Sequence, residues 1–235
     1  VEAVGPGVRG LEVGDHVAAS FIPSCGRCPS CAEGMQYLCD NGEEIQRGKP
    51  RHKGPTGMVR AMSGIGTFSE YSVVHENSIV KVGDWYPLDA VAITSCGVAT
   101  GWGSAVNVAG VKAGDTVVVI GTGGIGINAV QGAAMAGAAN VIAVDPVEMK
   151  REFAQTVGAT HAVASIEEAG PLVQDLSWGR GANAVLLTVG DATSDLFAPA
   201  MALVGKAGNL TLTSLSNITQ NEITLNTVDL AMMGK

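Results

Sequence analysis

Four of the five cysteines lie close together in the stretch CGRCPSCAEGMQYLC. Cys25, Cys28, Cys31 and Cys39 follow the spacing C-x2-C-x2-C-x7-C. Four thiolates at such short separations can surround one zinc ion tetrahedrally, and the glycines and proline between them favour the tight turns that this requires. Four protein ligands leave no position for water, so the sequence predicts a structural rather than a catalytic zinc.

Other uses of such a cysteine cluster are less consistent with the sequence. Disulfides need an oxidising compartment, of which the sequence gives no sign, and a thioredoxin-type pair uses a single CxxC. A zinc ribbon that binds nucleic acid would have basic surroundings, whereas the neighbouring AEGMQYLCDNGEE is acidic. A set of reduced thiols packed together is the remaining alternative to zinc.

A second candidate site is the glycine-rich stretch VVVIGTGGIG. Gly121, Gly123 and Gly126 give the pattern G-x-G-x-x-G, with Gly124 inside it, between an apolar β-branched run and a segment of small residues at helical spacing. In a dinucleotide-binding loop the first glycine permits a tight turn, the second lets the backbone approach a pyrophosphate, and the third allows close packing of helix on strand. The helix start then offers N–H groups to phosphate oxygens.

The predicted cofactor is NAD. Asp145 ends the next apolar run, about 20 residues beyond the loop, where a carboxylate can accept hydrogen bonds from a ribose and repel a 2′-phosphate. Lys150 either reaches the same ribose or stays solvated. Val189 and Gly190 follow a later apolar run, at the strand end where parallel sheets bind ligands. An ordinary strand–turn–helix unit with a solvated aspartate is the alternative.

The elements that must position these residues differ between the two parts of the chain. From residue 97 onward, strands are expected at 117–120, 141–144, 161–164, 184–188 and 209–213, with helices after the glycine loop and from about 146, 165 and 192. This alternation predicts an α/β fold with a Rossmann-type doubly wound parallel sheet. Residues 1–96 show short strand-like segments (GDHVAAS, TFSEYSVV, SIVKV) and little helix, which predicts a β-rich domain.

Composition limits the classes of partner. The formal net charge is −8 and the pI about 4.9, which argues against nucleic acid or a membrane surface as a partner and favours a small-molecule ligand. There is no apolar run of membrane-spanning length and no secretory signal, so we expect a cytoplasmic protein. The sequence starts at VEAVGPGV, which resembles the middle of a strand, and ends at LAMMGK without a cap. We therefore expect a piece of a longer protein.

The fifth cysteine, Cys96, lies among small apolar residues in ITSCGVATGWGSAV, where a lone cysteine is most often a buried hydrophobic residue. However, this stretch, the cysteine cluster, the glycine loop, VIAVDPVEMK and VGATHAVA together resemble the zinc-dependent medium-chain alcohol dehydrogenases along essentially the whole chain. The resemblance implies that Cys96 is a ligand of a second, catalytic zinc and that Thr100 lies near the nicotinamide.

The resemblance also implies a domain organisation. Residues 1–96 would be part of a GroES-like catalytic domain with the structural zinc lobe, and residues 97–235 an NAD-binding Rossmann domain that lacks its last strand. NEITLNTVDLAMMGK would include an edge strand that pairs across a dimer, so a homo-oligomer is expected for the full-length protein. The remaining catalytic zinc ligands would lie upstream of Val1, and we expect this chain to be inactive alone.

The implied activity is interconversion of an alcohol with an aldehyde or ketone by hydride transfer to NAD, with zinc as Lewis acid. A formaldehyde or thiol-adduct dehydrogenase of the same superfamily is an alternative, and AVDPVEMKREFA is similar to a bacterial branch that keeps NAD bound and uses an external electron acceptor. Zinc-free quinone reductases share the fold but would lack the four-cysteine lobe. A non-enzymatic NAD sensor is the alternative from another class, although it would not need Cys96.

Overall fold

The computed structural model describes residues 1–214 and 222–234. The chain divides into two compact units, Val1–Cys96 and Gly97–Lys235. Within the described residues, no helix combines the length and apolar character that crossing a membrane would require.

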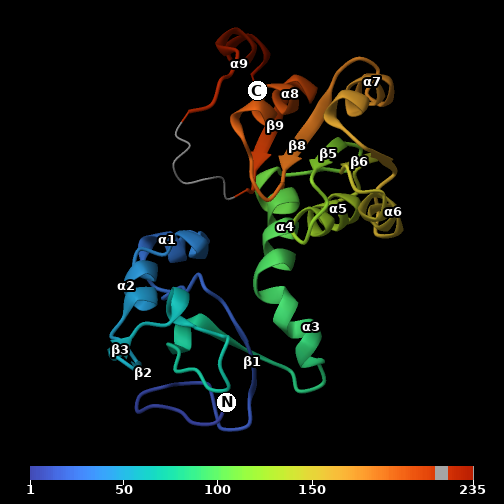
Figure 1. Ribbon diagram of the computed structural model, residues 1–235. Helices are drawn as coiled ribbons and strands as arrows, with labels where there is room; N and C mark the ends of the chain where they lie inside the picture. Colours follow the sequence, from blue (N-terminus) through green and yellow to red (C-terminus); the bar gives the residue numbers. More distant parts are fainter. Residues whose placement is uncertain (215–221, 235) are drawn as a thin grey trace. The chain divides into compact units, whose positions relative to one another are not determined.

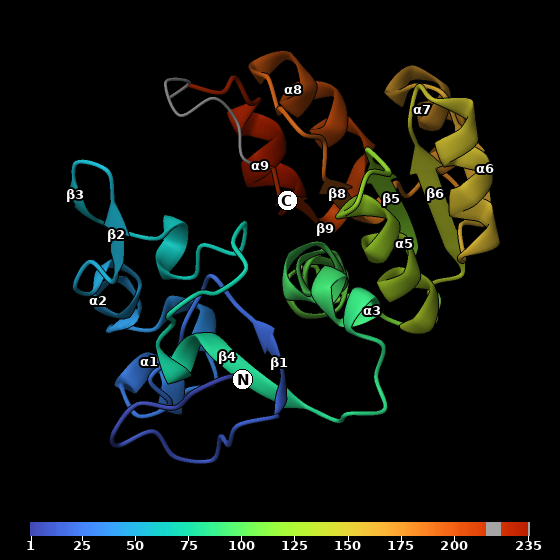
Figure 2. The same ribbon diagram turned by 60° about the horizontal axis from the view of Figure 1, so that its bottom comes forward.

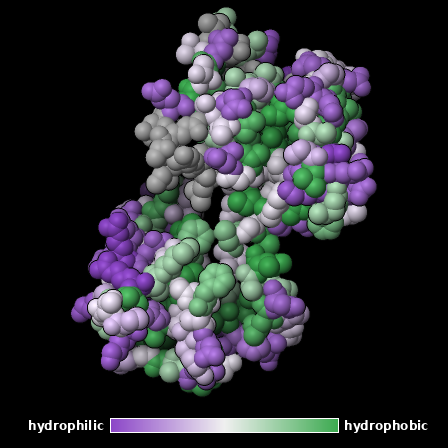
Figure 3. All heavy atoms as spheres, in the orientation of Figure 1, coloured by the Kyte–Doolittle hydropathy of each residue, from purple (hydrophilic) through white to green (hydrophobic). Residues whose placement is uncertain are grey.

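The first unit is built from small antiparallel sheets and short helices (Figure 1). β1 (His16–Ala19) pairs with β4 (Ile79–Val82), and β2 (His52–Gly54) forms a hairpin with β3 (Gly57–Val59). The helices are α1 (Pro29–Ala32), α2 (Gly42–Arg47) and α3 (Leu88–Ile93). Strongly hydrophilic side chains gather over α2 (Figure 3). The predicted β-rich first region is confirmed, and its strands form small antiparallel sheets.

Two strand predictions in this unit are wrong. TFSEYSVV (residues 67–74) and the initial VEAV have strand-like composition, yet neither segment forms a strand. Residues 70–73 are exposed, so this segment has no buried face to fix its register. Alternation of apolar and polar residues favours extended backbone, but a strand also needs a hydrogen-bonded neighbour.

The second unit contains a five-stranded parallel sheet, in the order β7-β6-β5-β8-β9. Its strands are β5 (Thr116–Ile120), β6 (Asn140–Val144), β7 (His161–Val163), β8 (Ala182–Leu187) and β9 (Val204–Leu212). The main helices are α5 (Gly126–Met135), α6 (Glu148–Thr156), α7 (Ile166–Leu176) and α8 (Ser194–Leu203), and α9 (Thr227–Met233) follows near the C-terminus. The predicted doubly wound parallel sheet is confirmed, and the central strand lies where the chain order reverses.

Each face of this sheet has its own core, because consecutive side chains of a strand point to opposite faces. Val117 and Val119 of β5 pack with Ala129 and Ala133 of α5. On the opposite face, Val118 and Ile120 belong to the core that includes residues of α7 and α8. Figures 1 and 2 show helices on both sides of the strands. A strand with two buried faces explains the uninterrupted apolar run before the glycine loop.

Residues 94–108 form helical structure that the sequence did not indicate. A π-helical turn (Thr94–Val98) is followed by α4 (Ala99–Gly103) and a second π-helical turn (Ser104–Val108). α4 packs closely on α5, since a Cβ at Gly101 would lie 2.1 Å from the Ile125 carbonyl oxygen. This glycine-containing stretch is thus helical, and Gly101 allows its close contact with the start of α5.

The expected edge strand near the C-terminus is also not found. Residues 222–226 of NEITLNTVDLAMMGK form no strand, and α9 follows directly, while Asn221 and Lys235 lie outside the described residues. Short alternation such as Ile223 and Leu225 favours a strand only where a neighbouring strand supplies hydrogen bonds. β9 in turn begins at Val204, five residues earlier than predicted.

Candidate functional site

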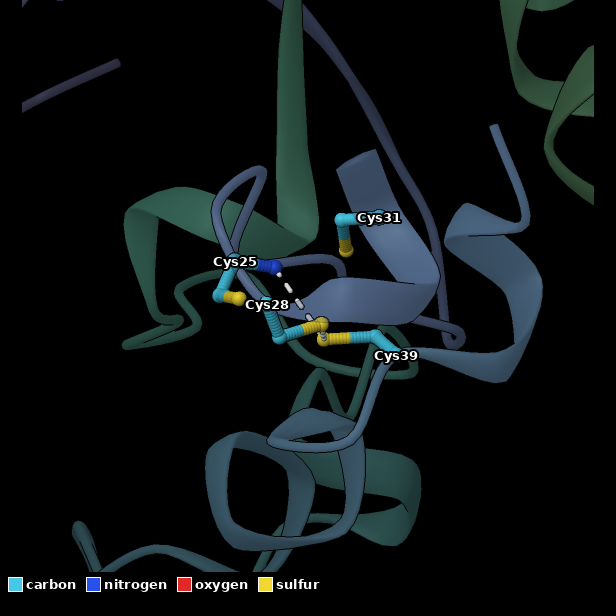
Figure 4. A group of neighbouring side chains, drawn as sticks. All are labelled: Cys25, Cys28, Cys31 and Cys39. Atoms are coloured by element: carbon cyan, nitrogen blue, oxygen red, sulfur yellow. Dashed lines mark hydrogen bonds between the residues drawn. The ribbon is translucent and has the colours of Figure 1, made fainter. Parts of the chain in front are cut away.

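The four clustered cysteines come from α1 and the loops on either side of it (Figure 4). Cys31 lies in α1, Cys28 immediately precedes it, and Cys39 follows a 3-10 turn. Gly26, with φ of +72°, turns the chain between the first two cysteines. The four Sγ atoms lie within 4.8 Å of one another.

The sulfur positions fit a tetrahedral zinc. Zn–S bonds of about 2.3 Å place the corners of a tetrahedron about 3.8 Å apart, and the Sγ atoms of Cys28 and Cys39 are 3.9 Å apart. Cys28 and Cys31 are buried, while the other two are half-buried. The cluster is therefore shaped for a closed structural site, as predicted.

Hydrogen bonds and burial act in opposite directions on the thiols. The backbone N–H of Arg27 and the side-chain amide of Asn41, whose Nδ2 lies 3.3 Å from the sulfur, lower the pKa of Cys25 to about 6. Burial raises the pKa of Cys31 to about 12. A cation is needed to keep the Cys31 sulfur ionised at neutral pH, which a zinc ion would supply.

The glycine loop joins β5 to α5 at the carboxyl end of the sheet. Gly121 has φ of +87°, and a Cβ there would lie 2.9 Å from a Val189 methyl group. At Gly126 a Cβ would lie 1.8 Å from the Gly121 carbonyl oxygen. These two glycines are required by the fold of the loop itself.

Gly123 and Gly124 differ from these two. A Cβ at either position would meet no atom of the described chain within 4 Å, and neither has a positive φ. Protein packing and backbone geometry therefore do not explain why these residues are glycine. A ligand that approaches the backbone closely would explain it.

The carboxylate of Asp145 lies against this loop, with its side chain only 4% exposed. It accepts hydrogen bonds from the backbone N–H of Thr122 at 2.9 Å, the Thr122 hydroxyl at 3.2 Å and the backbone N–H of Val147 at 2.9 Å. The Lys150 ammonium is 3.8 Å away. Burial opposes ionisation of Asp145, but these hydrogen bonds and the charge of Lys150 outweigh it and lower the pKa.

A pocket of about 440 Å³ opens beside the loop. Of the residues predicted to bind the cofactor, Gly121, Gly123, Asp145, Lys150, Val189 and Gly190 line it, whereas Gly124 and Gly126 do not. The carboxyl ends of β5, β6 and β8 and the start of α7 form its walls. The structure thus brings the glycine loop, Asp145 and the strand end at Val189 to one cavity. A carboxylate has about four acceptor positions. Three of those of Asp145 are used by the hydrogen bonds given above.

Cys96 and Thr100 are not among the residues that line this pocket. Cys96 is exposed, in the first π-helical turn, and belongs to no group of three or more metal-ligand side chains among residues 1–214 and 222–234. Thr100 is half-buried in α4, and its carbonyl oxygen accepts a 2.7 Å hydrogen bond from the Ser104 hydroxyl. Single π-helical turns are frequent at functional sites.

Two threonines that support the loop were missed by sequence reasoning. The Thr188 hydroxyl lies 2.6 Å from the Gly121 carbonyl oxygen and 3.0 Å from that of Ile120, so it ties β8 to the loop. Thr122 ties the loop to Asp145. The signal for Thr188 was its place at the carboxyl end of a strand, directly before Val189 and Gly190.

Two family models match most of the chain. Residues 1–84 match the alcohol dehydrogenase GroES-like domain, and residues 124–235 match the zinc-binding dehydrogenase family. Among curated proteins, the NDMA-dependent alcohol dehydrogenase of Amycolatopsis methanolica is 52% identical over 223 residues, which cover 92% of this chain and 60% of that protein. Putative alcohol dehydrogenase D of Mycobacterium tuberculosis is 43% identical over 244 residues, which cover all of this chain and 65% of that protein.

Solved structures give the same result. Benzyl alcohol dehydrogenase from Acinetobacter calcoaceticus superposes with a TM-score of 0.86 at 27% identity, covering 99% of this chain and 64% of that one. A zinc-binding-domain alcohol dehydrogenase protein from Burkholderia ambifaria gives 0.87 at 28% identity, with the same two coverages. The chain spans 60 to 65% of the length of the curated relatives above. With its two matching domains and its four-cysteine site, the chain belongs to the zinc-dependent medium-chain alcohol dehydrogenase family.

Proposed function

We propose that the protein containing this chain is an NAD-dependent alcohol dehydrogenase that interconverts an alcohol with an aldehyde or ketone by hydride transfer. The observation that carries the proposal is the open space at Gly123 and Gly124 beside a pocket lined by Asp145. Together with family membership, it gives the glycine loop a ligand-binding rather than a purely structural role. The names of the relatives described above support an alcohol as substrate.

NAD is proposed to bind with its pyrophosphate over Gly123 and Gly124 and its adenosine ribose at Asp145. The remaining acceptor position of the Asp145 carboxylate would accept a hydrogen bond from a ribose hydroxyl, and its negative charge would disfavour a 2′-phosphate. Lys150 adds a donor at the same wall of the pocket. Val189 and Gly190 border the cofactor further along the sheet edge, and Gly121 and Gly126 keep the loop in shape.

Cys96 is proposed as a ligand of the catalytic zinc and Thr100 as a contact of the nicotinamide. The exposed thiol of Cys96 can meet ligands from other parts of the full-length protein. Bound zinc would supply a Lewis acid for the substrate oxygen, and bound NAD would accept the hydride. The residues of this chain bind and orient these groups, while Cys25, Cys28, Cys31 and Cys39 hold the structural zinc.

Turnover by these 235 residues alone is not expected, because Cys96 joins no group of three ligands among the described residues. The full-length protein is proposed to act in the cytoplasm as a homo-oligomer. One relative is named as NDMA-dependent, which favours NDMA as a second acceptor to assay beside free NAD.

The test is the absorbance of NADH formed from a panel of primary and secondary alcohols and formaldehyde by the full-length protein, with and without NDMA. Activity is expected in the wild type and a loss of at least about 100-fold in Cys96→Ser, with unchanged NAD affinity. The matched variant Cys25→Ser should instead lower stability. Stoichiometric NAD binding without turnover of any substrate would support a sensor and refute the proposal.

A further inference from the structure

The positive charges of this acidic chain are unevenly distributed. Five of its 14 lysines and arginines lie between residues 47 and 60, and no Asp or Glu occurs from residue 45 to residue 69. The chain as a whole carries a net charge of −8. The net charge of the chain does not account for this local cluster of cations, so we consider the residues around it.

Several of these cations surround one small pocket in the first unit, which we call the basic pocket. The end of α2, the β2–β3 hairpin and the turn after it meet there, and its charged or ionisable lining residues are Arg47, Lys49, Arg51, His52 and Arg60. β2 and β3 are registered so that His52 lies opposite Val59, which places Arg60 next to this pair. Strand pairing therefore brings Arg60, which follows β3, close to the residues at the start of β2.

The basic pocket has little internal charge compensation. Only Arg47 forms an ion pair within the described residues, with Glu43 at 2.7 Å, and both side chains are largely exposed. The Arg51 guanidinium packs on the end of α2, where a Cβ at Gly48 would lie 3.0 Å from its Nη2. Lys49 and Arg60 are exposed and form no ion pair in the described part of the chain.

One residue that lines the basic pocket has a buried polar atom. The Nε2 atom of His52 is buried and has no hydrogen-bond partner among the described residues. A buried imidazole nitrogen without a partner is unfavourable, and with the proton on Nε2 it can donate a hydrogen bond to an oxygen atom in the pocket. The pocket volume is about 10 Å³, which is room for about one oxygen atom.

We propose that the basic pocket binds a phosphate group. One phosphate oxygen enters the pocket beside His52, and the other oxygens meet the exposed ammonium of Lys49 and guanidinium of Arg60. A compact oxyanion with several acceptor oxygens matches these converging donors. A monovalent carboxylate or chloride offers less charge and fewer acceptors for the same donors. Inorganic phosphate and a phosphate monoester present the same group, so both are probes.

The hairpin provides a matched control. Lys53 is the neighbour of His52, but successive side chains of a strand point to opposite faces, and Lys53 does not line the pocket. Lys53→Gln and Arg60→Gln each remove one positive charge from the same hairpin, but only Arg60 lines the basic pocket. A general effect of net charge would weaken binding equally in both variants.

The experiment is calorimetric titration of the complete zinc-loaded protein with inorganic phosphate and with phenyl phosphate, at ionic strength fixed with sodium chloride. We expect saturable binding in the wild type, weakened at least about tenfold in Arg60→Gln and in Lys49→Gln and less than about twofold in Lys53→Gln. Binding of phosphate but not of phenyl phosphate would identify the free anion as the ligand. Circular dichroism and zinc content check that each variant is folded.

Three results would overturn the proposal. Equal weakening in Arg60→Gln and Lys53→Gln would indicate nonspecific attraction. Unchanged affinity in folded Arg60→Gln and Lys49→Gln would place any phosphate elsewhere, for example at the glycine loop of the second unit. Equal competition by sodium acetate would show that the pocket does not select phosphate.

Discussion

Asp145 combines two roles that oppose each other. As a cofactor ligand it should present its carboxylate to the pocket, but in the structure most of its acceptor capacity is used by Thr122 and Val147. These bonds fix the carboxylate in one orientation before a ligand binds, which lowers the ordering that binding must impose. The same carboxylate thus supports the loop and, under the proposed function, would also select the cofactor.

Removing the Asp145 charge should change cofactor selectivity. In Asp145→Asn the repulsion of a 2′-phosphate is lost, so we expect NAD affinity to fall about tenfold while NADP affinity changes little or rises. Fluorescence titration with both cofactors measures this. Asp175→Asn, an exposed change on α7, serves as the control with unchanged affinities. Equal loss for both cofactors would show that Asp145 acts only on loop structure.

Asp145 should also make stability depend on pH. Its pKa is lowered in the folded state, so its contribution to stability is complete above the unfolded pKa of about 4 and is lost as pH falls through the lower folded pKa. The contribution should be about 1–3 kcal/mol. The difference in unfolding free energy between wild type and Asp145→Asn should therefore be full at pH 7 and shrink as the pH falls below about 4. A constant difference across this range would contradict the assignment.

At the scale of elements, substitutions at different glycines of the loop should affect protein stability and NAD affinity separately. In Gly126→Ala the new methyl group would collide with the Gly121 carbonyl and the Thr188 hydroxyl, so we expect a loss of about 3 kcal/mol in stability. In Gly123→Ala it would meet no protein atom, so stability should hold, or rise slightly, while NAD affinity falls at least about tenfold. Denaturant unfolding and NAD titration of both variants check this. Unchanged NAD affinity in Gly123→Ala would remove the main support for the cofactor site.

The sequence predicts best the elements whose residue pattern is local and fits only one environment, such as a strand buried on both faces. The run Val117–Ile120 could only suit a strand buried on both faces, and it is the central strand. The helical residues 94–108 were missed because their glycines serve contact with α5, which is not visible from propensity. The strand at residues 67–74 was predicted from composition and the edge strand within NEITLNTVDLAMMGK from the family resemblance, and neither signal supplies a neighbouring strand.

The sequence predicted the cysteine cluster completely but the cofactor pocket only in part. The cysteine spacing specified all members of the metal cluster because its ligands are close in sequence. The pocket could be located from Gly121 and Asp145, but its support by Thr188 depends on a contact between residues far apart in sequence. Such contacts are determined by strand order, which a motif does not encode.

At the scale of the whole molecule, the two units are stabilised in different ways. Both hydrophobic core clusters of the described structure lie entirely in the second unit. Besides the buried Pro23, three hydrophobic residues are buried among those described in the first unit: Cys28, Cys31 and Val91. Two of the three are metal-ligand candidates, so the interior of this unit is largely the cysteine cluster itself. Small units with little apolar core commonly depend on a structural metal.

Zinc removal should therefore affect the two units unequally. Structural zinc sites contribute about 10 kcal/mol or more to folding, which exceeds what three buried apolar residues can replace. After chelation we expect fast hydrogen exchange across residues 25–47 and across β1 and β4, while β5, β6 and β8 keep their protection. Exchange measured by mass spectrometry with and without a chelator separates the two, and Cys39→Ser should reproduce the chelated pattern without any chelator. Equal loss of protection in β5 would mean that the second unit also relies on zinc, and protection retained around Cys31 would mean that packed thiols alone hold the first unit together.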